Sequence, residues 1–151
     1  MMQTTFSTPT DTTIAYERRF DAPIDRVWAA YTEPELVQQW LGYGEFVTCE
    51  MDIRPGGSYL WVWRLDDGNE LTIRGEVVDA QAPTLLVADE YMADQPSPAR
   101  SHIEFHDADG ATVMSGTIEF ATKEIRDAAH ESGMAQGMDW SFDRMAALLA
   151  K

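Results

Sequence analysis

The chain contains few of the residues that cross-link a protein or attach it to nucleic acid. Its single cysteine, Cys49, rules out an internal disulfide, and a reducing, cytoplasmic location is the simplest interpretation. Lys and Arg total 11 against 26 Asp and Glu, for a formal net charge of −15. Because no basic stripe is present to displace counterions from phosphates, we expect neither nucleic acid nor a membrane surface as a partner.

Long apolar runs are also missing. No stretch of about eighteen consecutive apolar residues occurs, and residues 1–20 lack the pattern of a secretory signal, so a membrane span or export is not expected. What the chain does have is 44% apolar and 11% aromatic residues over a length of 151. This composition predicts one compact domain over residues 1–151, with an acidic surface that keeps it in solution.

The hydrophobic period changes several times along the first third of the chain. Residues 12–21 alternate between apolar and polar, which predicts a strand. Apolar residues then recur at helical spacing up to Tyr31, after Pro23 in a first-turn position and Asp21 as a candidate N-cap. Pro34 ends this helix and begins a second short one that runs through Trp40.

The middle of the chain has the pattern of an antiparallel meander, with turn signals such as Pro55-Gly56-Gly57 between its strands. Strands are expected at 45–52, 58–65, 70–79, 84–92, 100–106 and 111–120. Gly75 and Gly116 lie inside two of them, which predicts a bulge or a sharp bend at each.

Helical period returns after residue 122. A short helix is expected at 123–131 and a longer one at 134–149. In the longer helix, Asp139, Asp143 and Arg144 fall off the apolar face. That face is formed by Met134, Met138, Phe142, Met145 and Leu149. Together these elements predict an α+β protein in which a curved antiparallel sheet of about seven strands packs on the C-terminal helix.

One strand carries an unusual row of aromatic residues. Tyr59, Trp61 and Trp63 alternate after the Pro-Gly-Gly corner and therefore share one face. Such a row either fills a core or borders an apolar cavity, and the sequence leaves both alternatives open.

Residues that suggest catalysis are few. His102, Glu104 and His106 alternate on one strand face, and the two histidines are about 13 Å apart, too far to share a metal. No metal or cofactor is therefore expected. Asp89 and Glu90 are weak candidates for acid–base work, because a carboxyl in an apolar pocket has a raised pKa. The flanking residues are similarly apolar on both faces, so periodicity does not decide which carboxyl points inward.

Several phrases along nearly the whole chain resemble the branch of the START-like (SRPBCC) superfamily formed by homologues of the activator of the heat-shock ATPase. They are Phe20-Asp21-Ala22-Pro23 through Val27-Trp28, Pro34-Glu35-Leu36 to Trp40, Asp52-x-Arg54-Pro55-Gly56-Gly57, Asp67-Gly68, Gly75-Glu76-Val77 and Gly133-Met134-x-x-Gly137-Met138 to Arg144. The resemblance implies a helix-grip fold with an apolar cavity between sheet and C-terminal helix. Many relatives have Gly-Trp where this chain has Gly137-Met138, so a flexible thioether replaces a rigid ring.

These observations predict that the protein binds or carries a small apolar or aromatic molecule in that cavity. Two alternatives stay open: a cyclase- or hydratase-type enzyme that uses acid–base residues in the cavity, and a module that interacts with a chaperone ATPase, which only the family resemblance implies. We expect ligand contacts from Trp40, Tyr59, Trp61, Trp63, Ile73, Tyr91, Met134, Met138 and Phe142.

Overall fold

A computed structural model describes residues 3–92, 95 and 97–151. In this part of the chain eight antiparallel strands form one sheet in the order β1-β2-β8-β7-β6-β5-β4-β3. The strands are β1 Thr5–Ser7, β2 Thr13–Phe20, β3 Glu45–Asp52, β4 Ser58–Arg64, β5 Glu70–Gln81, β6 Leu85–Met92, β7 Ala99–Ala108 and β8 Ala111–Glu119. The helices are α1 Ile24–Thr32, α2 Pro34–Trp40, α3 Lys123–Glu131 and α4 Met134–Leu149.

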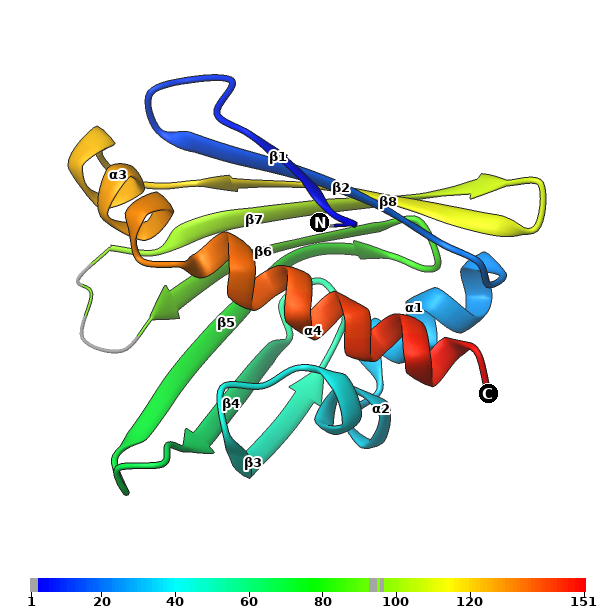
Figure 1. Ribbon diagram of the computed structural model, residues 1–151, viewed down its shortest axis with the longest axis horizontal. Coiled ribbons are helices and arrows are strands. Elements are labelled where there is room, and N and C mark those ends of the chain that lie inside the picture. The colour runs from blue at the N-terminus through cyan, green and yellow to red at the C-terminus, as the bar shows by residue number, and fades with distance from the viewer. Residues whose placement is uncertain (1–2, 93–94, 96) are drawn as a thin grey trace.

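The predicted α+β helix-grip architecture is confirmed, with one strand more than expected. The addition is β1, whose three residues pair with β2 and are too short to show an alternating pattern. Figure 1 shows α4 crossing the curved sheet, with α3 near its first residues and α1 and α2 near its last. No helix in the described part of the chain is long and apolar enough to cross a membrane.

The grip is held by the apolar face of α4. Phe142, Met145 and Leu149 are buried in the main core cluster. The Phe142 ring lies 5.9 Å from the ring of Tyr16 on β2 and 6.0 Å from that of Trp40 on α2. Phe142 of α4 therefore contacts both the sheet and α2.

The expectation that Asp139 lies off the buried face of α4 is wrong. Its side chain is buried, and its Oδ1 accepts a hydrogen bond of 3.0 Å from the backbone N–H of Thr4. Arg18 on β2, also buried, places Nη1 at 3.5 Å from Asp139 Oδ1 and at 2.7 Å from Asp143 Oδ1. A charged pair thus replaces apolar contact where α4 passes the β1–β2 edge, and each buried charge has a partner.

The bulges of the sheet fall at two valines rather than at the predicted glycines. The register shifts at Val47 on β3 and at Val78 on β5, and both side chains are exposed because each is the extra residue of a bulge. Gly75 pairs regularly with Tyr59. A Cβ on Gly75 would lie 2.1 Å from Cζ of Tyr59, so the glycine lets the tyrosine ring lie flat across β5.

Gly116 does the same for Tyr16. The two residues are register partners on β8 and β2, and a Cβ on Gly116 would lie 2.1 Å from Cζ of Tyr16. The register is regular at both glycines, so neither carries the predicted bulge, and each glycine leaves room for the close approach of a tyrosine ring.

Candidate functional site

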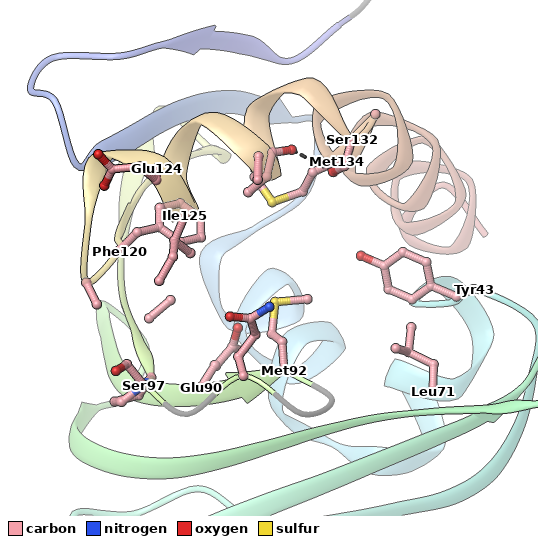
Figure 2. Close-up of a pocket in the computed structure, with 17 residues that line it drawn as sticks. Tyr43, Leu71, Glu90, Met92, Ser97, Phe120, Glu124, Ile125, Ser132 and Met134 are labelled. Carbon is pink, nitrogen blue, oxygen red and sulfur yellow. Dashed lines mark hydrogen bonds between the residues drawn. The ribbon is translucent and has the colours of Figure 1, made fainter.

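A cavity opens at the end of the sheet that α3 covers. Its mouth has a volume of about 570 Å³ and lies between the ends of β6 and β7, α3 and the start of α4. In Figure 2, Glu90 and Met92 rise from β6 below the cavity and Met134 lies above it. Phe120 and Ile125 close one side, and Tyr43 and Leu71 stand on the other.

The mouth adjoins an inner chamber of about 90 Å³ between the sheet and α4. The two spaces share part of their walls, and the shared residues are Tyr43, Glu90, Met92, Ala99, Phe120 and Met134. The rest of the chamber wall includes six aromatic residues, namely Tyr16, Tyr31, Trp40, Trp61, Trp63 and Phe142. A ligand that enters the mouth would therefore meet a mainly aromatic interior.

Glu90 is the charged residue at the junction of these spaces. It also borders a third, small hollow of about 10 Å³ under Tyr59 and Trp61. Tyr59, Gly75 and Glu90 form a row across β4, β5 and β6, because Gly75 is the register partner of both others. The Tyr59 ring crosses Gly75, and its hydroxyl donates a hydrogen bond to Oε2 of Glu90.

Burial raises the pKa of Glu90 above its ordinary value, and the hydrogen bond from Tyr59 partly offsets that shift. The pKa of Tyr59 is raised well above its ordinary value, first by burial and then by the neighbouring Glu90. Burial also raises the pKa values of Tyr16 and Tyr31, to which Glu90 adds. The phenols thus remain neutral hydrogen-bonding groups around a single carboxyl.

Asp89 and Tyr91, the neighbours of Glu90, lie on the outer face of the sheet. Arg100 donates from Nε to Asp89 Oδ1 at 2.5 Å and from Nη2 to Oδ2 at 3.1 Å. The Arg74 guanidinium lies 4.0 Å from the ring centroid of Tyr91. Because side chains alternate along a strand, Glu90 between them points inward. Neither Asp89 nor Tyr91 lines the cavity, contrary to the expectation for Tyr91.

The other predicted ligand contacts border the cavity spaces. Trp40, Trp61, Trp63, Ile73, Met134, Met138 and Phe142 line the inner chamber, and Tyr59 lines the small hollow. That any of them touches a ligand remains a prediction. The sequence did not predict Tyr16 and Tyr31 as cavity residues. Their positions in the hydrophobic pattern indicated only that they are buried.

Tyr43 was also missed, because it stands in the irregular segment Gly42-Tyr43-Gly44. Its ring meets that of Trp63 edge to face, with 5.3 Å between ring centroids. Arg144 on α4 holds the segment in place by donating to the carbonyl oxygens of Trp40 at 2.9 Å and Gly42 at 3.2 Å. Tyr43 therefore forms the boundary between mouth and chamber.

Two indole groups of the chamber wall have unused hydrogen-bonding capacity. Nε1 of Trp61 and Nε1 of Trp63 are buried and have no hydrogen-bond partner in the described part of the chain. Nε1 of Trp40, in contrast, donates to the carbonyl of Ala30 at 2.7 Å. A buried donor without a partner costs about 1–3 kcal/mol, so these two groups lower the stability of the chamber wall.

Other reactive residues lie outside the cavity. His102 and His106 are on the outer face, where their Nε2 atoms lie 3.3 Å and 4.0 Å from carboxylate oxygens of Glu104. Among residues 3–92, 95 and 97–151 no group of three His, Cys, Asp or Glu side chains is placed to hold a metal. Burial raises the pKa of Cys49 to about 11, which disfavours the reactive thiolate at neutral pH.

A curved antiparallel sheet closed by a C-terminal helix over an aromatic cavity defines the helix-grip class of START-like proteins. Within that class, the sequence model described as "Activator of Hsp90 ATPase homolog 1-like protein" matches residues 21–150, and the chain belongs to that family.

Solved structures share the fold along almost the whole chain. A protein from Rhodobacter sphaeroides is 26% identical with a TM-score of 0.91, and the match covers 97% of each chain. Proteins from Mycobacterium smegmatis and Nitrosomonas europaea have TM-scores of 0.84 at 21% and 22% identity. The match to the Mycobacterium protein covers 96% of this chain and 95% of that protein, and the match to the Nitrosomonas protein covers 95% and 97%. A comparison with curated proteins gives no match.

Proposed function

We propose that this protein binds a small, mainly apolar or aromatic molecule in the cavity between the sheet and α4. The observation that carries the proposal is the continuity of an open mouth of about 570 Å³ with an aromatic inner chamber. Ligand sites commonly have volumes of about 300–1,000 Å³, apolar walls and a few polar groups that fix orientation. Here the polar groups are Glu90 and the phenols around it.

The chamber is smaller than a ligand of drug size, so the mouth holds part of the molecule. Met92, Met134 and Met138 line these spaces, and their flexible side chains adapt to a ligand's shape at low cost. The tryptophan wall supplies flat surfaces for stacking. The fold of the family supports binding in this cavity. The class of ligand is the part that the proposal adds.

Tryptophan fluorescence tests the proposal directly. A flat aromatic ligand such as a flavonoid should quench the emission, and Trp61→Ala should weaken its binding by more than about 1 kcal/mol because a stacking surface is lost. Trp140→Ala is the matched control, because Trp140 is 59% exposed on α4 and lines none of the cavity spaces. Circular dichroism checks that both variants fold. The absence of any change with apolar ligands at millimolar concentration would contradict the proposal.

Acid–base catalysis is the second candidate, and the position of Glu90 favours it. A half-buried carboxyl with a raised pKa, hydrogen-bonded to Tyr59 and open to a cavity, has the properties of a general acid or base. If a substrate is found, Glu90→Gln should lower the rate by roughly 10²–10⁴ at unchanged fold, while Asp89→Asn should not. Full activity of Glu90→Gln would refute this candidate. The chaperone-partner alternative stays a prediction from the family description.

A further inference from the structure

Among the residues that the structure describes, Glu90 has no cationic partner. In the described part of the chain no Arg, Lys or His lines the mouth, the chamber or the small hollow beneath it. The buried arginine of β2, Arg18, is already paired with Asp139 and Asp143. Since a buried carboxylate without a counter-charge is costly, a ligand that brings a positive charge would remove that cost.

One oxygen of Glu90 has no hydrogen-bond donor among the described residues and is open to such a ligand. Oε2 accepts the hydrogen bond from Tyr59, which fixes the orientation of the carboxyl group. Oε1 accepts no hydrogen bond from any described residue and is not among the buried atoms that lack a partner. Glu90 therefore offers an acceptor in a fixed position at the junction of mouth and chamber.

The aromatic surroundings favour a cation over an anion. Faces of tryptophan and tyrosine rings carry negative charge density and attract ammonium groups within about 6 Å. Around Glu90 the walls include Tyr31, Tyr59 and Trp61. Glu124 lies at the mouth, and the formal net charge of the chain is −15, so the field at the entrance attracts cations and repels anions.

We propose that the ligand is an aromatic or apolar molecule with a basic nitrogen, whose ammonium group pairs with Oε1 of Glu90 while its ring system occupies the aromatic chamber. This inference rests on the proposed function and adds the charge of the ligand to it. Pairing the two groups leaves the buried site neutral overall. An anionic ligand would instead place a second negative charge beside Glu90.

Three probes of nearly equal shape test this: 1-naphthylmethylamine, 1-naphthylmethanol and 1-naphthoic acid. Their dissociation constants are measured by titration calorimetry at pH 7 with the whole chain. We expect the amine to bind at least tenfold more tightly than the alcohol, and the acid to bind most weakly. In Glu90→Gln the amine should lose at least tenfold in affinity, whereas the alcohol should change by less than threefold.

Asp89→Asn is the matched control. It removes the same formal charge one residue away, but Asp89 is on the outer face and pairs with Arg100. The preference for the amine should persist in this variant. If the preference also persists in Glu90→Gln, the inference is overturned, because the long-range field rather than Glu90 then selects the cation.

The remaining outcomes separate this inference from the proposed function. Equal binding of amine and alcohol by the unmodified protein overturns the inference and leaves cavity binding intact. Failure of all three probes to bind contradicts the proposed function itself. If Glu90→Gln does not fold, nuclear Overhauser contacts in the unmodified protein decide the question: the methylene group of the bound amine should contact the Glu90 side chain, and contacts elsewhere overturn the inference.

Discussion

Substitution of Gly75 by alanine tests how the floor of the cavity is built. The new Cβ would lie 2.1 Å from Cζ of Tyr59 and 2.3 Å and 2.5 Å from its two Cε atoms. Carbon atoms in contact are about 3.5–4.0 Å apart, so the ring must move by roughly 1.5 Å. Tyr59 is buried, and the ring of Trp61 lies only 4.4 Å away between centroids, so little space is available.

The cost follows from these contacts. Overpacking of a core costs about 1–3 kcal/mol, and loss of the hydrogen bond from Tyr59 to Glu90 adds about 0.5–1.5 kcal/mol. Alanine in a strand otherwise gains about 0.5–1 kcal/mol over glycine. Gly75→Ala should therefore lower the free energy of unfolding by about 0.5–4 kcal/mol and weaken ligand binding at the same time.

A double-mutant cycle with Tyr59→Ala isolates the contact. Urea unfolding followed by circular dichroism gives the stability of each variant. Without the ring, Gly75→Ala should be neutral or stabilising, so the two changes should couple strongly. Equal effects of Gly75→Ala in both backgrounds, or no destabilisation of the single variant, would show that contact with the Tyr59 ring is not what requires glycine here.

Two further predictions concern the buried charges. Because the folded protein holds the Glu90 proton more tightly than the unfolded chain, the contribution of Glu90 to stability should fall as pH rises from its ordinary pKa of 4.5 through the raised value. Urea unfolding of Glu90→Gln should therefore show a stability gain over the unmodified protein that grows from pH 4.5 upward and then levels; a gain independent of pH would contradict the shift. Arg18→Met leaves Asp139 buried without its cation and should cost about 3–5 kcal/mol, part of which Asp139→Asn in the same chain should recover. No recovery in the double variant would show that the ion pair is not the cause.

The periodic spacing of apolar residues along the chain was enough to predict most of the fold. Alternating residues predicted seven of the strands, and the stripe on α4 predicted which side meets the sheet, because a strand or helix with one apolar face must cover it. Burial of Asp139 was not predictable in this way. Its partner Arg18 is 121 residues distant in the sequence, and only the folded chain brings the two together.

The site shows the same limit. Periodicity placed Asp89 and Glu90 on opposite faces of β6. It did not show which of the two points inward, because apolar residues flank both. The register of β4, β5 and β6 decides it, because Gly75 leaves room for Tyr59 to reach Glu90. The row of Tyr59, Trp61 and Trp63 correctly predicted one wall of the cavity. The Gly42-Tyr43-Gly44 segment has no hydrophobic period, so the position of Tyr43 could not be inferred from the sequence.

The central claim is that a small molecule enters the aromatic chamber, and the indole N–H signals in a ¹⁵N-resolved NMR titration test it most directly. The chain has five tryptophans, of which Trp61 and Trp63 line the chamber and Trp140 lies exposed on α4. On titration with 1-naphthylmethylamine, we expect large saturable shifts of the Trp61 and Trp63 signals and an unchanged Trp140 signal. Shifts confined to Trp140, or none at all up to millimolar concentration, would contradict it.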